Sequence, residues 1–245
     1  MNIPIVFEDD YLLVVDKPIG VAVNRSENEK RETLQDWAEE NLKSQISPAS
    51  PGTGRANLKS NEDYYKRAGI VHRLDKDTSG LLIIAKNPSV FLKLQQLFAS
   101  HEVDKKYYAL VHGKVTSRDG EINLPVGRLP WNRRKFGVIP EGRTAVTRYK
   151  VLEHYEEYSF LDINPLTGRT HQIRIHFKSL GHSLVGDRLY AGNKVYEKDM
   201  SFCERLFLQA YFLSFIHPET GKKVEYKIEL DRELREVLSK LKCQI

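Results

Sequence analysis

A continuous apolar run at residues 81–85 directly follows the most charge-dense segment of the chain, residues 70–80. An apolar run of this length that begins at a bend predicts a buried strand. The bend itself contains a His, Arg73, Lys76 and two carboxylates. Charged groups beside a core destabilise it unless they are paired. Gly80 allows the chain to turn sharply into the strand, and the rest of the fold has to accommodate this polar bend.

Composition and charge narrow the class of protein. The 245 residues include 29% charged and 40% hydrophobic residues, which is typical of a globular chain. A net charge of +5 favours an anionic partner such as nucleic acid, although a basic surface that serves only solubility explains it equally well. Two cysteines are too few for a disulfide framework and fit a reducing cytosol. With no signal-peptide pattern and no apolar run of about 20 residues, we expect a cytoplasmic monomer that does not enter a membrane.

Strand-like and helix-like segments do not alternate regularly, which argues against a doubly wound parallel sheet. The sequence therefore predicts an α+β fold with a mixed, largely antiparallel central sheet flanked by helices and loops, and one domain over residues 1–245. Residues 45–68, rich in Ser, Pro, Gly and Asn, are expected to form a long surface loop. Helix starts are predicted after Thr33, Asn87, Thr170 and Asp231.

Asp75 is the first candidate catalytic residue. A carboxylate can act as a nucleophile, a general base or an electrostatic stabiliser. The alternative is that Asp75 and Asp77 only cap the bend and pair with Arg73 or Lys76. In a protein taken at random, the structural explanation would be favoured.

A second candidate group lies in residues 167–176, at the start of a predicted helix. His171 and Arg174 share a helix face because they are three residues apart. Basic groups near a helix N-terminus suit an anion, and a guanidinium there can hold a catalytic carboxylate ionised. The alternative is a solvated basic face. His171 and His176 are five residues apart and fall on different faces, so we expect no metal site.

Two further segments suggest contact with a nucleic acid. In a strand over residues 105–111, Tyr107 and Tyr108 point to opposite faces, so one is expected in the core and the other can stack on a base. Residues 127–136 interleave aromatic side chains with basic ones that suit phosphate contacts. These basic residues are Arg128, Arg133, Arg134 and Lys135.

Taken together, these segments resemble the RluA family of pseudouridine synthases. The resemblance begins at residues 17–20 (Lys-Pro-Ile-Gly) and includes the 71–80 bend and the 105–111 segment with Gly113. It continues through residues 166–176, then Gly181-His182, and Gly186-Asp187 with Tyr190. Three such motifs in the same order are highly specific.

The resemblance implies a pseudouridine synthase fold and conversion of uridine to pseudouridine in structured rRNA or tRNA, without cofactor or metal. Asp75 would be the nucleophile, and Arg73 would fill the stack vacated by the flipped uridine. Tyr107 would pack on the base and assist proton removal, Arg174 would pair with Asp75, and Ile175 would line the other side of the base. No S4 RNA-binding module is expected before residue 1.

Two other functions remain open on the sequence. A glycosidase acting on nucleosides or sugars could use Asp75 and Asp77 as its carboxylate pair. A non-catalytic RNA-binding protein would need only the basic and aromatic segments. Motifs for nucleotide binding and for a serine nucleophile are missing from the sequence, so the chemistry must rest on other side chains.

Overall fold

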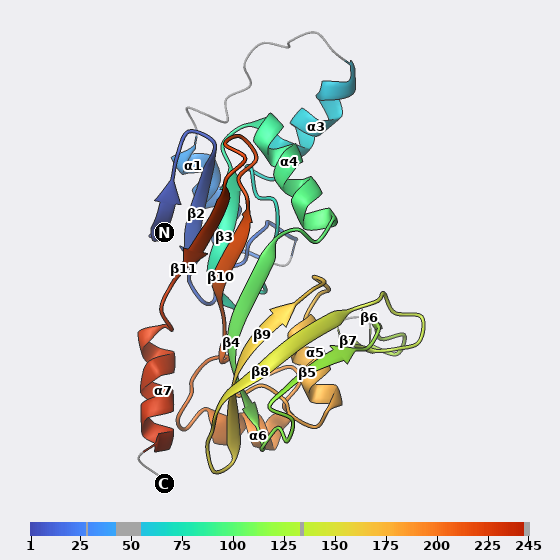
Figure 1. Ribbon diagram of the computed structural model, residues 1–245, viewed down its shortest axis with the longest axis vertical. Helices are drawn as coiled ribbons and strands as arrows, with labels where there is room; N and C mark the ends of the chain where they lie inside the picture. Colours follow the sequence, from blue (N-terminus) through green and yellow to red (C-terminus); the bar gives the residue numbers. More distant parts are fainter. Residues whose placement is uncertain (28, 43–54, 133–134, 243–245) are drawn as a thin grey trace. The chain divides into compact units, whose positions relative to one another are not determined.

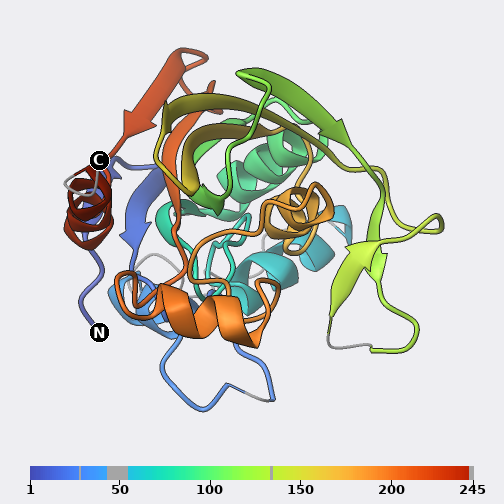
Figure 2. The same cartoon turned by 90° about the horizontal axis from the view of Figure 1, so that it is seen from below.

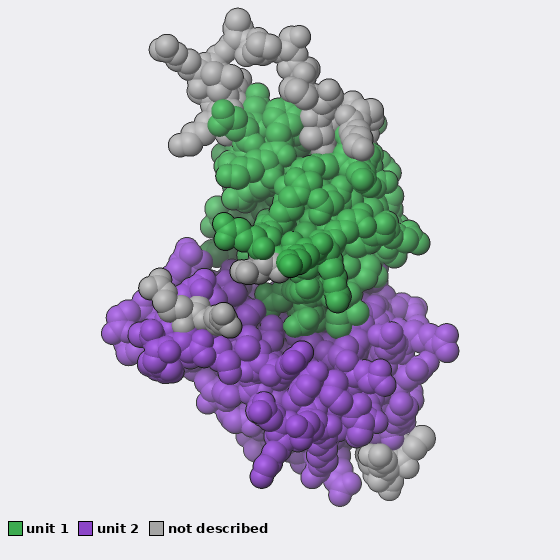
Figure 3. All heavy atoms as spheres, turned by 180° about the vertical axis from the view of Figure 1, so that it is seen from behind, with its two compact units in different colours: residues 1–103, 213–227 green, residues 104–212, 228–245 purple. Residues whose placement is uncertain are grey.

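The computed structural model describes residues 1–27, 29–42, 55–132 and 135–242. The chain divides into two compact units, shown in different colours in Figure 3. Unit 1 comprises residues 1–103 and 213–227, and unit 2 comprises residues 104–212 and 228–245. Strand β10 (Leu208–Ile216) has residues in both.

Unit 1 is built around the predicted apolar strand, which is β3 (Ser79–Ala85) and is buried along its whole length. Strand β2 pairs antiparallel with β1 and with β3, and β10 and β11 complete the strands of this unit (Figure 1). Its other elements are β1 (Ile5–Glu8), β2 (Leu12–Lys17), β11 (Lys223–Lys227), α1 (Leu34–Asn41), α3 (Arg55–Lys66) and α4 (Pro88–Ala99). The prediction of a buried strand after the polar bend is confirmed.

Local signals place three helix starts correctly, since the helix Arg232–Lys242 also begins directly after Asp231. Thr33 is the N-cap of α1, and its side chain forms a reciprocal capping box with Asp36. Asn87 is the N-cap of α4, where its side chain accepts a hydrogen bond from the N–H of Val90. These caps work because they satisfy backbone donors that the first turn of a helix leaves without partners.

The prediction of a surface loop over residues 45–68 is wrong at residues 55–66. Residues 55–66 form α3, and Tyr64 of this helix is fully buried against Phe91 of α4. The Tyr64 hydroxyl also donates to the carbonyl oxygen of Lys86 at 2.7 Å. Tertiary packing therefore stabilises a helix that weak periodicity does not indicate. Residues 45–54 of the expected loop lie outside the described part.

In unit 2 the strands pair in the order β10-β4-β9-β8-β5, and β6 and β7 form a separate hairpin. The pairs β4–β9, β8–β9 and β5–β8 are antiparallel. The strands are β4 (Asp104–His112), β5 (Asp119–Asn123), β6 (Val126–Arg128), β7 (Phe136–Val138), β8 (Val146–His154) and β9 (Tyr158–Pro165). The helices are α5 (Gln172–Ser179), α6 (Asn193–Asp199) and α7 (Arg232–Lys242).

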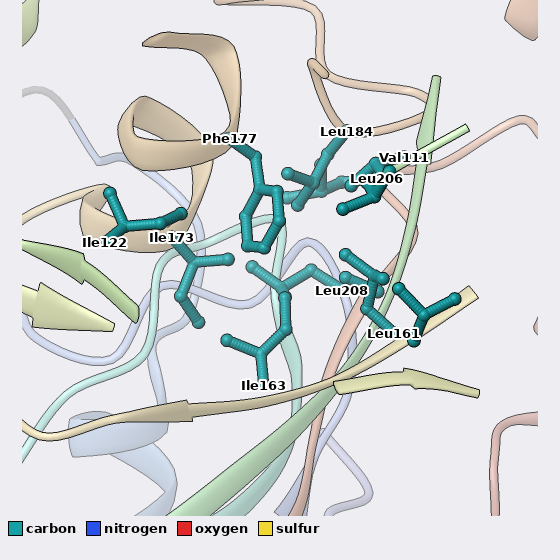
Figure 4. Packing of buried hydrophobic residues seen from close by; sticks show 12 residues of the cluster. Val111, Ile122, Leu161, Ile163, Ile173, Phe177, Leu184, Leu206 and Leu208 are labelled. Atoms are coloured by element: carbon teal, nitrogen blue, oxygen red, sulfur yellow. The ribbon is translucent and has the colours of Figure 1, made fainter. Parts of the chain in front are cut away.

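Two helices cover opposite faces of this sheet. Ile173 and Phe177 of α5 pack on one face, in the cluster of Figure 4, and Figure 2 shows α5 beside the curved strands. Leu234 and Val237 of α7 pack with Leu110 in a second cluster. Since side chains alternate along a strand, β4 contributes to both clusters.

Among the residues that the structure describes, hydrogen bonds join nine strands into the main sheet. The fold is therefore α+β with a large, mostly antiparallel sheet, as predicted. The expectation of one domain over residues 1–245 stays a prediction.

Candidate active site

Asp75 lies in a tight turn immediately before β3. The N–H of Thr78 donates to the carbonyl oxygen of Asp75 at 3.1 Å, which closes the turn. Asp75 is half-buried, Lys76 and Asp77 are exposed at the tip, and Thr78 is buried again where the strand approaches. The turn therefore presents one carboxylate at the edge of the core and the other in solvent.

A buried lysine, Lys17, stabilises the backbone of this turn with hydrogen bonds. Lys17 is fully buried, and its Nζ donates to the carbonyl oxygens of Pro18 at 2.9 Å and Val21 at 2.8 Å. It also donates to the carbonyl oxygen of Lys76 at 3.3 Å, which accepts a second bond from the N–H of Gly20 at 2.9 Å. A buried ammonium is tolerated because its protons are used in this way. The Lys-Pro-Ile-Gly segment thus fixes the backbone beside Asp75.

Two other side chains of the bend, those of His72 and Lys76, have structural contacts. His72 Nε2 accepts from the N–H of Ile83 at 3.0 Å, and its ring stacks on Phe98 with 4.4 Å between centroids. Lys76 forms an ion pair with Glu29. Arg73 is exposed. The bend therefore combines two side chains that hold its shape, His72 and Lys76, with exposed Arg73 and half-buried Asp75.

Arg174 lies on α5 and is 4% exposed, so the expected alternative of a solvated basic face is wrong. Its Nε and Nη2 donate to the two oxygens of Asp187, at 2.8 and 2.7 Å. This fork is the geometry in which Arg binds a carboxylate most strongly. The N–H groups of Leu189 and Tyr190 also donate to Asp187, at 3.0 and 3.1 Å, so the carboxylate is itself held in place.

Gly186 sets the backbone beside Asp187. It has a φ of +71°, and a Cβ there would lie 2.0 Å from the carbonyl oxygen of Arg205. Only glycine tolerates both conditions. The N–H of Gly186 donates to buried Asp199 at 2.9 Å, and Asp199 also contacts His112 Nε2 at 3.1 Å. These contacts fix the segment that carries Asp187.

Helix α5 begins one residue later than predicted. Its N-cap is His171, with a φ of 55° and no side-chain cap, rather than Thr170. The side chain of Gln172 accepts from the N–H of Arg169 at 2.9 Å and from the Thr167 hydroxyl at 2.7 Å. The buried Gln172 amide therefore fixes the segment that leads into the helix and does not cap its first turn.

The two histidines of this helix have separate partners. His171 Nδ1 lies 2.8 Å from the hydroxyl of Tyr190. His176 is fully buried, with Nδ1 2.9 Å from the Thr147 hydroxyl and Nε2 3.0 Å from the carbonyl oxygen of Leu124. Among the described residues, no group of three or more His, Cys, Asp or Glu side chains is arranged to hold a metal ion.

The two tyrosines of β4 have different surroundings. Tyr108 stacks on Tyr211, with ring centroids 3.7 Å apart and an interplanar angle of 5°. Burial raises the pKa of the Tyr108 hydroxyl. Tyr107 is half-buried and packs at the margin of the cluster that contains Ile163 and Ile173. Tyr108 is half-buried as well, at the margin of the cluster that contains Leu110, so burial does not distinguish the two tyrosines.

The remaining predicted residues fall in several places. Ile175 is 3% exposed and packs with Val126, Ala145 and Tyr190. Arg128 is exposed and lies over the Phe136 ring at 4.8 Å, and Lys135 is half-buried. Arg133 and Arg134 lie outside the described residues.

The predicted site residues divide between the two units. Asp75 and Arg73 belong to unit 1, and Tyr107, Arg174 and Ile175 belong to unit 2. The proposed pairing of Asp75 with Arg174 therefore stays a prediction. The sequence assigned no role to Asp187 and Tyr190, although both lie in a motif that it singled out.

Comparison with known proteins identifies the family. Residues 11–179 match the RNA pseudouridylate synthase family. The chain belongs to the RluA family of RNA pseudouridine synthases. It is 36% identical to ribosomal large subunit pseudouridine synthase D of Zymomonas mobilis, over 94% of this chain and 70% of that protein. It is 35% identical to the uncharacterized RNA pseudouridine synthase YlyB of Bacillus subtilis, over 99% and 74%.

Solved structures agree with this membership. Human RNA pseudouridylate synthase domain containing 1 superposes with a TM-score of 0.68 at 26% identity, over 98% of this chain and 95% of that one. The human domain containing 4 protein has a TM-score of 0.72 at 21% identity, over 98% and 93%, and supports the fold. As a member of the RluA family, the chain is an isomerase that acts on RNA, and the glycosidase and non-catalytic alternatives are not favoured. In the described part of the chain, no helix has the length and apolar character needed to cross a bilayer.

Proposed function

We propose that this protein isomerises uridines of ribosomal RNA to pseudouridine with Asp75 as the nucleophile. The observation that supports this role is the Asp75 turn, in which a half-buried carboxylate stands on a backbone held by Lys17 and Gly20. Preorganisation of this kind is what a nucleophile requires. Asp77, at the exposed tip, has no comparable support and is assigned no part in the chemistry.

The reaction rearranges bonds without adding or removing atoms. The bond from the sugar C1′ to N1 of uracil breaks, and a bond from C1′ to C5 forms. The proton on C5 leaves, and N1 gains a proton. The proposed nucleophile makes a temporary bond to the substrate and is released unchanged, so the reaction needs no oxidant or reductant.

Each of the other residues has a proposed task. A uridine inside folded RNA must be flipped out, at a cost of a few kcal/mol. Exposed Arg73, with its planar guanidinium, is proposed to occupy the vacated position. Tyr107 and Ile175 are proposed to contact the two sides of the base, and Arg174 to stabilise the charge of the Asp75 carboxylate.

Ribosomal RNA is the first candidate substrate because one relative is named for the large ribosomal subunit. The same proposal includes a cytoplasmic monomer, which acts where ribosomal RNA is available. Mapping of pseudouridines in RNA from cells with and without the protein tests the choice of substrate. If the pseudouridines that disappear lie in transfer RNA rather than ribosomal RNA, transfer RNA becomes the proposed substrate.

Asp75→Asn tests the nucleophile, with Asp77→Asn as the matched control on the same turn. We expect Asp75→Asn to reduce pseudouridine formation by at least about a thousandfold, as removal of a nucleophile does elsewhere, while RNA affinity stays close to wild type. Asp77→Asn should retain activity. Substantial product from Asp75→Asn would contradict the assignment, and free uracil from the wild type would instead indicate a glycosidase.

A further inference from the structure

Tyr190 contacts Arg174 with its ring and Asp187 with its backbone. It is 4% exposed, and its ring lies 5.1 Å from the Arg174 guanidinium carbon. Its N–H donates to Asp187, and its carbonyl oxygen accepts from Lys178 Nζ at 2.6 Å. Both the backbone and the ring of Tyr190 are therefore held in position.

The ring of Tyr190 complements the carboxylate of Asp187. The bidentate fork fixes the guanidinium edge that faces Asp187. An aromatic face attracts a cation, and more strongly where water is excluded. The carboxylate and the ring therefore restrain different sides of Arg174. Their joint effect is to limit the positions that the guanidinium can take.

The hydroxyl of Tyr190 extends this arrangement to the β6–β7 hairpin. It accepts from the N–H of Phe136 at 3.4 Å and lies 2.8 Å from His171 Nδ1. Phe136 pairs with Arg128 across the hairpin, and the Arg128 guanidinium lies over its ring. His171 is the N-cap of α5, three residues before Arg174. One hydroxyl thus joins a hairpin with an exposed cation to the helix that carries Arg174.

We propose that Tyr190 is a positioning residue that fixes the Arg174 guanidinium and couples it to the β6–β7 hairpin. This inference rests on the role proposed above for Arg174. Tyr190 touches no reacting atom, and its effect is exerted through Arg174. An RNA that engages the hairpin through Arg128 therefore acts on the same hydrogen-bonded unit that orients the catalytic arginine.

Tyr190→Phe removes only the hydroxyl and keeps the ring over Arg174. Loss of one buried hydrogen-bonded group corresponds to a decrease of about five- to tenfold in the single-turnover rate constant. RNA affinity should change less than about twofold, because positioning affects the reacting state more than the bound ground state. Tyr155→Phe is the control, since Tyr155 is also buried in unit 2 and its hydroxyl donates to Glu153 instead.

Arg174→Lys separates positioning from general support of the fold. If Tyr190 acts through Arg174, Tyr190→Phe should have less than about a twofold effect in the Arg174→Lys background. NMR gives a second readout that needs no activity. The Arg174 Nε–H should exchange with water faster in Tyr190→Phe and at the wild-type rate in Tyr155→Phe.

Three outcomes would overturn the role of Tyr190. They are a wild-type rate in Tyr190→Phe, an equal loss in both Arg174 backgrounds, or unchanged exchange of the Arg174 Nε–H. Asp75→Asn is measured beside them. An inactive Asp75→Asn with a fully active Tyr190→Phe leaves the proposed function intact and rejects only the coupling, whereas an active Asp75→Asn rejects the proposed function itself.

Discussion

Two ionisable side chains of helix α5, Arg174 and His176, are buried in different ways. The charge of Arg174 is compensated by Asp187, whose two carboxylate oxygens accept hydrogen bonds from the guanidinium. His176 instead contacts the Thr147 hydroxyl and the carbonyl oxygen of Leu124, which suit a neutral ring with one donor and one acceptor. Burial lowers the pKa of His176 below the ordinary value of 6.5.

The His176 pKa predicts a pH dependence of stability. The unfolded chain takes up a proton near pH 6.5, whereas the folded chain resists it, so stability is complete above that pH and declines as pH falls toward the lowered folded pKa. One proton gives a slope of at most about 1.4 kcal/mol per pH unit. When the free energy of unfolding is measured with urea between pH 5 and 7.5, it should depend less steeply on pH in His176→Gln than in the wild type. An unchanged slope would exclude His176 as its source.

At the scale of elements, local capping and tertiary packing make different contributions. Helix α4 has a strong local start, with Asn87 as N-cap and Pro88 at its first position. Helix α3 instead packs buried Tyr64 on α4. Sequence rules therefore predict α4 and miss α3.

The cap of α4 has a measurable effect. Asn87→Ala should lower the free energy of unfolding by about 1 kcal/mol, because the N–H of Val90 loses its partner. Asn87→Ser, which can cap in the same way, should retain most of the stability. Denaturant unfolding of the three proteins provides the comparison, and equal losses in Ala and Ser would show that the cap is not the cause.

At the scale of the whole molecule, the net charge of +5 predicts that RNA binding weakens steeply with salt. This salt dependence is set by the basic side chains that contact RNA phosphates and not by the net charge of the whole chain. Arg128 is exposed on the hairpin, whereas Arg232 is exposed on α7 and paired with Glu236. We expect only the first to contribute.

A salt titration of RNA affinity distinguishes these two arginines. Arg128→Ala should weaken binding and reduce the slope of log affinity against log salt by about 1, since one phosphate contact is lost. Arg232→Ala should leave affinity and slope unchanged. A slope that both variants alter equally would indicate that general charge, rather than the hairpin, sets the binding.

Sequence patterns alone specify the α+β class, the buried strand β3, the helix caps at Thr33 and Asn87, and the family. The strand and the caps rest on short-range patterns, and the fold class and the family rest on the order in which such patterns follow one another along the chain. Three features emerge only from tertiary contacts: Arg174 is buried on Asp187, Tyr190 joins it to the hairpin, and residues 55–66 are helical. Burial and pairing depend on contacts between residues distant in sequence, and no local pattern specifies them.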